Sequence, residues 1–176
     1  MIDSVIKGKR LKAIEVSRTH ISELVSFKLV LNDKVVGKCH YFSGREYYPP
    51  WLELDYDPWP RKEGLELELF AYLFTFLPSN SRFFVTYYKD EETLNLIMKG
   101  LSAADTPIGR SLLSAGFSWL KTWYFPEGGN EGGVKIQANK VIDNELRRRQ
   151  LQEILVEVKT DETKSLIADL LAQGKP

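Results

Sequence analysis

Residues 64–77, GLELELFAYLFTFL, place the strongest constraint on the fold, because they carry apolar side chains on nearly every face of a helix. Such a helix has to be buried against another layer of structure rather than lie on a surface. The preceding run WLELDY, residues 51–56, alternates apolar and polar side chains, which is typical of a strand. Its Leu52, Leu54 and Tyr56 share one face, and Trp51, Glu53 and Asp55 share the other. A strand, a turn over residues 57–66 and a buried helix are therefore predicted.

The rest of the chain alternates in the same way between strand and helix patterns. Asn32 and Asp33 suit the positive-φ positions of a tight turn between two strands. Thr106 followed by Pro107 predicts a helix start, and Gly116 predicts the end of that helix. The predicted strands are 11–16, 81–88, 117–125 and 132–140, together with the two arms of a hairpin over 26–42. A short helix is predicted near 19–23. A longer helix is predicted after Asp90, and its core stripe is Leu94, Ile97, Met98 and Leu101.

The last part of the chain differs in character. Helix-forming residues dominate from Val141 to Ala172, Thr160 or Asp161 can begin a second helix, and Leu166, Ile167, Leu170 and Leu171 form one apolar stripe. We expect an α/β (α+β) fold with a mixed, mostly antiparallel central sheet, flanking helices and a C-terminal helical hairpin. Residues 1–140 then form the main domain, and residues 141–176 form an extension packed on it or on a partner, through which the chain could form a homo-oligomer.

Composition excludes several classes of function. Lys plus Arg and Asp plus Glu number 24 each, so the chain has no net charge to attract it to nucleic acid or to an anionic membrane. Arg147, Arg148 and Arg149 are interpreted as a solvated helix face. One cysteine, Cys39, and two histidines give no metal-ligand spacing. We find no secretory signal and no run of apolar residues long enough to span a membrane, so a soluble cytoplasmic protein is expected.

The predicted turn carries a recognisable motif. Tyr56, Pro58, Arg61, Gly64 and Glu66 have the spacing of V-x-P-x-x-R-x-x-G-x-G/A, and so the segment resembles the signature of the GNAT superfamily of N-acyltransferases. Residues 112–128, LLSAGFSWLKTWYFPEG, are similar to that superfamily's L-Y-x-x-x-G-F passage, and the hairpin ending in VVG resembles its second and third strands. The whole chain also resembles a small family of uncharacterised microbial proteins placed beside these acyltransferases.

The resemblance implies a fold, a cofactor and a site. It implies a sheet splayed near its centre and binding of acetyl-CoA or another acyl-CoA, with transfer of the acyl group to a small-molecule or protein amine. The amides and cations of Arg61, Lys62, Glu63, Gly64, Leu65 and Glu66 would hold the pyrophosphate, and the edge of the strand at Tyr56 would pair with the pantetheine arm. Glu53 or Asp55 would remove the proton from the attacking ammonium, with His40 as the next candidate.

Two departures from the superfamily pattern leave an alternative open. Glu66 stands where the superfamily has a small residue, and Leu112 stands where it often has a tyrosine that protonates the leaving thiolate. A carboxylate in the first helical turn is itself stabilised by the helix dipole, so Glu63 or Glu66 could occupy the anion site. Glu53 and Asp55 could equally be solvent-facing acids. The alternative is a catalytically silent binding or assembly module that keeps the fold without acyl-CoA binding.

Overall fold

The computed structural model describes residues 2–6, 9–19, 24–31, 33–44, 50–56, 59–74, 82–86, 91–125, 133–141 and 143–174. Side chains are described for these residues except 2–19, 56, 59–60, 74, 82–86, 124–125 and 133–134. The expected helix start at Asp90, the short helix near 19–23 beyond its first residue and the glycine-rich loop after Phe125 lie outside this part of the chain.

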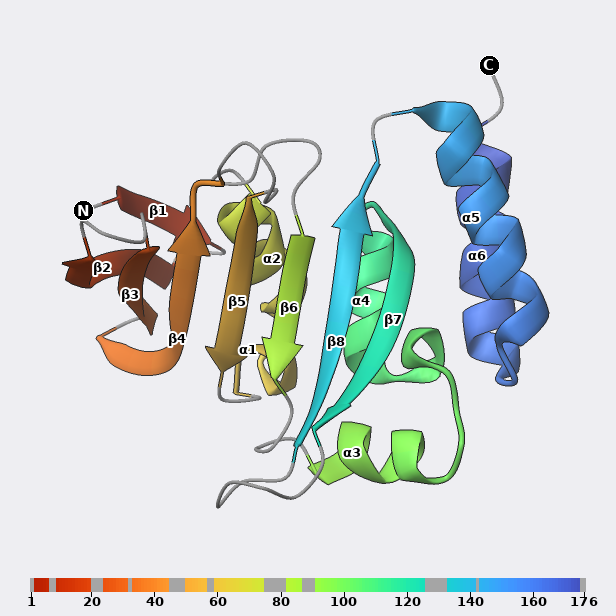
Figure 1. The fold of residues 1–176 in the computed structure, drawn as a ribbon, viewed down its shortest axis with the longest axis horizontal. Helices are drawn as coiled ribbons and strands as arrows, with labels where there is room; N and C mark the ends of the chain where they lie inside the picture. The colour runs from red at the N-terminus through yellow and green to blue at the C-terminus, as the bar shows by residue number, and fades with distance from the viewer. Residues whose placement is uncertain are drawn as a thin grey trace.

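One mixed sheet runs through the described part of the molecule (Figure 1), with strand order β1-β2-β3-β4-β5-β6-β8-β7. The first five strands pair antiparallel, each with the next along the chain: β1 (Ile2–Ile6), β2 (Lys9–Thr19), β3 (Leu24–Leu31), β4 (Lys34–Phe42) and β5 (Trp51–Tyr56). Asp33 in the β3–β4 turn has a φ of 61°, as the hairpin prediction requires. β1 was not predicted from the sequence.

The centre of the sheet holds its one parallel pair among the described strands. β5 pairs with β6 (Arg82–Thr86) from Trp51 opposite Arg82 to Asp55 opposite Thr86. The register is continuous over these five positions, so β5 and β6 do not separate there. The splay of strands expected near the centre of the sheet is therefore not seen in this pair. β8 (Gly133–Lys140) follows antiparallel to β6, and β7 (Phe117–Phe125) forms the far edge.

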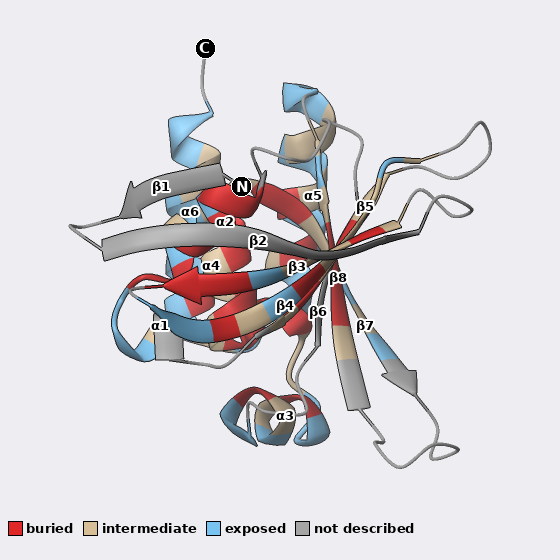
Figure 2. Ribbon diagram, turned by 90° about the vertical axis from the view of Figure 1, so that its left-hand side faces the viewer, coloured by how far each residue is buried: buried red, intermediate tan, exposed pale blue. Residues whose placement is uncertain are grey.

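Helices cover one face of this sheet. Figure 2 shows α2 (Glu66–Phe74) and α4 (Pro107–Ser114) on the same side of the sheet. Phe70, Leu69 and Leu73 of α2 are at most 1% exposed, so this helix is buried against the sheet as its apolar pattern predicts. The core between the layers contains Leu29, Leu31, Val36, Cys39, Leu52, Leu54, Leu65, Leu69, Phe70, Tyr72, Leu73, Ile97, Ala103, Ile108, Leu112, Phe117, Ile136 and Ala138.

Short helices join β6 to β7. α3 (Glu91–Met98) buries Thr93 and Ile97, and the 3-10 helix η1 (Ala103–Asp105) leads directly into α4. Thr106 caps α4 by accepting the N–H of Gly109, and Pro107 occupies the first turn, as predicted. Met98 was assigned to the core stripe of α3, and this assignment is wrong, because its side chain is 71% exposed.

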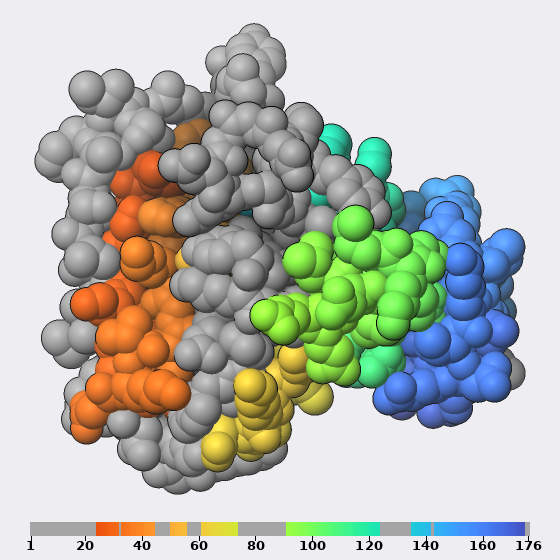
Figure 3. Space-filling model, turned by 90° about the horizontal axis from the view of Figure 1, so that it is seen from below, coloured from red at the N-terminus to blue at the C-terminus, as the bar shows by residue number. Residues whose placement is uncertain are grey.

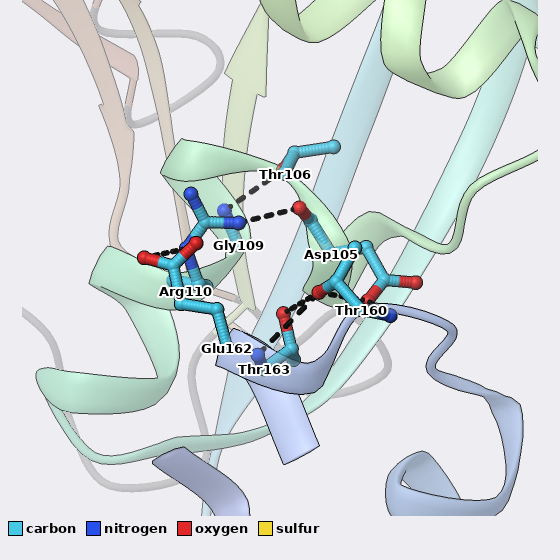
Figure 4. Close-up of polar contacts among 7 residues, drawn as sticks. All are labelled: Asp105, Thr106, Gly109, Arg110, Thr160, Glu162 and Thr163. Carbon is cyan, nitrogen blue, oxygen red and sulfur yellow. Dashed lines mark hydrogen bonds and ion pairs between the residues drawn. The ribbon is translucent and has the colours of Figure 1, made fainter. Parts of the chain in front are cut away.

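Two further helices, α5 (Asn144–Glu157) and α6 (Asp161–Gln173), lie side by side at the β7 end of the sheet (Figure 1). A second hydrophobic cluster joins them to the body: Ala104, Leu113, Leu151, Ile154, Val158 and Ile167, with Leu166, Leu170 and Leu171 packed against it. Polar contacts from Asp105 and Arg110 to the start of α6 reinforce this contact (Figure 4). The apolar stripe of α6 therefore packs on the body of the same chain.

Candidate functional site

The two faces of β5 differ as its alternating pattern predicts. Leu52 and Leu54 are at most 1% exposed and pack under the helices, whereas Trp51, Glu53 and Asp55 are half-buried on the other face. Among the described helices, none lies over that second face in Figure 2. Both carboxylates proposed as bases therefore stand on the sheet face opposite α2 and α4, and neither is fully exposed to solvent.

Glu53 forms an ion pair that the sequence did not reveal. Its Oε1 contacts Nζ of Lys135, which comes from β8, two strands away. The two side chains are only 25% and 26% exposed, so solvent screens the attraction less than at an open surface. This ion pair ties β5 to β8 across β6 on this face of the sheet.

His40 lies next to Glu53 in the β4–β5 register, on the same sheet face. Its Nδ1 is 2.8 Å from Oγ of Ser26, its neighbour on β3, and the contact is partly buried. Ser26, His40 and Glu53 therefore form a row of three polar residues across three adjacent strands. The hydrogen bond fixes the orientation of the imidazole ring, which a base needs in order to act at a defined atom.

The same face continues across β8 and β7 with oriented polar and aromatic groups. Gln137, only 5% exposed, accepts a hydrogen bond from Nε1 of Trp123 at 2.9 Å and donates one to Asn139 at 3.3 Å. The ammonium of Lys121 lies 4.8 Å from the centre of the Trp123 ring. At the β4 side of the face, Phe42 stacks on Trp51 with ring centroids 5.8 Å apart. These contacts hold the side chains around Glu53 in set positions.

The predicted turn is partly helical. α1 (Trp59–Lys62) forms a single turn, and the N–H of Gly64 then donates to the carbonyl of Arg61 at 2.9 Å. Gly64 has a φ of 69° and is exposed, with no heavy atom within 4 Å of the place where a Cβ would stand. Glycine adopts this left-handed conformation without the steric cost that other residues meet. The backbone just before α2 is therefore open to close approach from outside.

Glu66, the first residue of α2, does not point to solvent. It is 3% exposed, whereas Lys62, Glu63 and Gly64 are all exposed. A carboxylate in the first turn of a helix lies near the positive end of the helix dipole. Of Glu63 and Glu66, only Glu66 is therefore buried at the positive end of the helix dipole, where its carboxylate could take the place of a bound anion.

Arg61 is engaged with another helix. Its Nη2 donates to Oε2 of Glu92 in α3 at 3.4 Å, and Figure 3 shows these two parts of the chain in contact at the surface. Glu92 is 63% exposed, so the pair is open to water and to competing ions. Tyr56 ends β5 opposite Gly37 of β4, and its side chain lies outside the described set.

The structure thus brings the predicted residues into one strand–turn–helix unit, with Glu53 and Asp55 on the strand and residues 61–66 in the turn and first helical residue. Sequence reasoning missed Lys135, Gln137, Ser26 and Glu92. Residues 133–140 were predicted as a strand, but their placement beside β6 depends on the strand order, which a single sequence does not reveal. Leu112, at 0% exposed, is a core residue and supplies no proton donor.

The described residues hold neither a candidate metal site nor a membrane-spanning helix. They contain no group of three or more His, Cys, Asp or Glu side chains that could hold a metal ion. None of the described helices combines the length and the apolar character needed to cross a membrane.

Comparison with solved structures finds a similar fold in a protein of unknown function from Aquifex aeolicus VF5. It is 26% identical, with a TM-score of 0.70 over 95% of this chain and 90% of that one. An acetyltransferase of the GNAT family from Bacillus anthracis is 17% identical, with a TM-score of 0.34 over 64% of this chain and 63% of that one. The comparison with curated proteins finds no match. A family model described as "Protein of unknown function (DUF1122)" matches residues 7–161.

Proposed function

Since the chain belongs to the DUF1122 family of proteins of unknown function, its activity has to be inferred from its own residues, and we propose that it is an N-acyltransferase. In this proposal acetyl-CoA or another acyl-CoA binds at the turn between β5 and α2, in a domain with the GNAT fold. The acyl group then passes to a small-molecule or protein amine. Residues 1–140 form the catalytic unit, and residues 141–176 form the extension packed on it.

The conformation of Gly64 is the observation that carries the proposal. It is exposed, its φ is 69°, and apart from its chain neighbours no heavy atom lies within 4 Å of the place of a Cβ, two positions before α2 begins at Glu66. The first N–H groups of a helix have no acceptor within the helix, and together with the dipole they favour a phosphate. A glycine at this point lets phosphate oxygens approach the backbone more closely than a side chain would allow.

Cations next to this backbone support the same ligand. Lys62 is exposed beside the turn, and Arg61 pairs with Glu92, whose side chain is 63% exposed. Because the Glu92 side of this pair is open to solvent, the phosphates of a bound cofactor could compete with that carboxylate for Arg61. Arg61 would then make charge-assisted hydrogen bonds to the phosphate oxygens.

The proton of the attacking ammonium would go to a carboxylate on β5, directly or through water. Asp55 lies one residue from the end of the strand that leads to the turn, and Glu53 lies two residues further back. Because Asp55 lies nearer to the turn, it is the first choice as base, and Glu53, which is paired with Lys135, and the adjacent His40 hold the acceptor.

A second candidate rests on Glu66. Its carboxylate is buried in the first turn of α2, where the proposed phosphate would gain from the same dipole. If the carboxylate keeps this position, the anion site is filled from within the chain. The protein would then be a catalytically silent module with an acyltransferase-like fold.

Calorimetric titration with acetyl-CoA and with free CoA separates the two candidates. The enzyme proposal expects micromolar binding that Arg61→Ala weakens by about tenfold, the loss of one charge-assisted hydrogen bond. Lys164→Ala removes a 48%-exposed cation of α6, outside the strand–turn–helix unit, and serves as the matched control. Absence of heat with wild type, together with binding by Glu66→Gly, would establish the silent module.

A further inference from the structure

Two lysines stand directly opposite each other on the sheet face that carries Glu53. Lys28 of β3 and Lys38 of β4 are cross-strand partners, and both are exposed. The side chains of such partners leave the same face, with Cβ atoms about 4.5–5.5 Å apart, and like charges in this arrangement destabilise the pair of strands. An anion between the two ammonium groups offsets their repulsion. The pair of lysines therefore favours an anion-binding role over a role in folding.

Ser26 and His40 form the next pair on this face and complete a basic cluster with the two lysines. They are cross-strand partners, each two residues along its strand from Lys28 or Lys38. The hydrogen bond of 2.8 Å between Oγ of Ser26 and Nδ1 of His40 holds both side chains in place. Ammonium groups and hydroxyls are common partners of phosphate oxygens in proteins. The basic cluster, which consists of Ser26, Lys28, Lys38 and His40, is therefore suited to a phosphate group.

Carboxylates stand beside the basic cluster on the next strand. Asp55 of β5 is the cross-strand partner of Lys38, and Glu53 is that of His40. Both acids are half-buried, and none of the described helices lies over this face in Figure 2. The face is thus basic over β3 and β4 and acidic over β5. A ligand that matches both parts carries a negative group and a positive group.

We propose that this face binds a small soluble amine that carries a phosphomonoester group. Its phosphate lies between Lys28 and Lys38, and its ammonium lies against Asp55. Neighbouring strands are about 4.8 Å apart, so the two ligand charges stand between one and two strand spacings from each other, which a short alkyl spacer covers. The ligand and the protein are also matched in charge. The phosphate carries about two negative charges near pH 8 and the ammonium carries one positive charge, while three lysines and two carboxylates, with Lys135 paired to Glu53, leave the face with one surplus positive charge.

Binding of this ligand is a property of the sheet face and does not require acyl transfer. Its role as the acyl acceptor rests on the proposed function, in which Asp55 is the base. The two ideas are tested separately, because the titration below contains no acyl-CoA. A protein that binds the phosphorylated amine without binding acetyl-CoA would support this inference and remove the proposed acyltransferase.

The test is an NMR titration of the full chain that follows the backbone amides of β3, β4 and β5 at about pH 8. The probes are 2-aminoethyl phosphate, ethyl phosphate, which lacks the ammonium, and 2-aminoethanol, which lacks the phosphate, all at constant ionic strength. We expect 2-aminoethyl phosphate to bind about tenfold more tightly than ethyl phosphate, with the largest shifts at residues 26–28 and 38–40. Equal affinities of the two phosphates, shifts confined to other parts of the chain, or no shift with any probe would overturn the proposal.

Variants separate the two halves of the site. Lys28→Gln should weaken both phosphates by about fivefold or more, whereas Asp55→Asn should bring the affinity of 2-aminoethyl phosphate down to that of ethyl phosphate. Lys164→Gln removes a 48%-exposed cation of α6 and should leave both affinities unchanged. An equal loss in the Lys28 and Lys164 variants would contradict the proposal.

Thermal unfolding distinguishes binding from a structural role of Lys28. Because Lys28→Gln removes one of two like charges that face each other, its unfolding midpoint without ligand should equal or exceed that of wild type. Added 2-aminoethyl phosphate should raise the midpoint of wild type more than that of the variant. A variant that unfolds at a lower temperature than wild type without ligand would show that Lys28 serves the fold, and would overturn the proposal.

Discussion

The carboxylate of Asp105 accepts the backbone N–H of Thr160 at 3.1 Å, and so joins two segments that are 55 residues apart in the sequence. The same carboxylate accepts the hydroxyl of Thr160 at 2.8 Å, the N–H of Lys159 at 3.0 Å and the hydroxyl of Ser102 at 3.1 Å. Asp105 is 1% exposed, and Figure 4 shows it facing the start of α6. One side chain therefore holds η1, the α5–α6 linker and α6 together.

Asp105→Ala is predicted to destabilise the protein by more than about 3 kcal/mol. The change leaves two backbone N–H groups and two hydroxyls without their acceptor, and each such group costs roughly 1–3 kcal/mol when it stays buried. Urea unfolding measures the effect. Asp161→Ala is the matched control, because Asp161 is fully exposed and its contact with Lys164 is 3.9 Å long. That change should fall within about 0.5 kcal/mol of wild type.

Acid should weaken the same contact. Burial by itself raises the pKa of Asp105, but the hydrogen bonds from Lys159, Thr160 and Ser102 outweigh it and hold the pKa below its ordinary value. Because the folded pKa is the lower one, the stability contributed by the carboxylate is complete above about pH 5 and is lost as the pH falls through the folded value. The free-energy difference between wild type and Asp105→Asn should therefore shrink from pH 7 towards about pH 3. A difference independent of pH would contradict this prediction.

Gly109→Ala is predicted to destabilise, although alanine is normally the better residue in a helix. A Cβ at this position would lie 1.9 Å from the carbonyl oxygen of Ala103 and 2.9 Å from Cα of Ala104. Both atoms belong to backbone, so η1 and α4 would have to separate, at a cost of about 1–3 kcal/mol or more. Thermal unfolding measures the loss. Gly174→Ala, whose Cβ would meet nothing closer than 3.8 Å, should change stability by less than about 0.5 kcal/mol.

Cys39 should not react with thiol reagents in the folded protein. Its side chain is 2% exposed, and burial, with a smaller effect from the charge of Glu53, raises the pKa of the thiol to about 12. The thiolate, which is the reactive form, is therefore scarce near pH 8 as well as inaccessible. Reaction with Ellman's reagent should be slow in buffer and complete in guanidinium chloride. Rapid labelling of the folded protein would show that β4 opens readily.

Local patterns predicted most strands and helix starts correctly. Leu52 and Leu54 are buried opposite Glu53 and Asp55 because strand side chains alternate between faces, and this alternation is visible in six residues. The cap formed by Thr106 and Pro107 is equally local, since it needs only the residues from 106 to 109. Interactions of this range involve residues that are close together in the sequence.

The features that were missed depend on distant parts of the chain. Glu53 meets Lys135 only because β6 and β8 lie beside β5 in that order. Met98 follows the helical stripe but ends α3, where packing stops at Ile97. Whether Glu66 faces solvent or the interior depends on the packing around the start of α2, and the motif around it carries no information on that choice.

The parallel pair of β5 and β6 also divides the chain into two parts with different folding requirements. Strands β1 to β5 each pair with the next strand along the chain, so their contacts need only short loops and can form early. Pairing of β6 with β5 requires the whole crossover through α2 to be in place first. We expect pulsed hydrogen exchange during refolding to protect the amides of β3 and β4 before those of β6. During synthesis on the ribosome, the edge of β5 that pairs with β6 would therefore stay unpaired until residues 82–86 have been made.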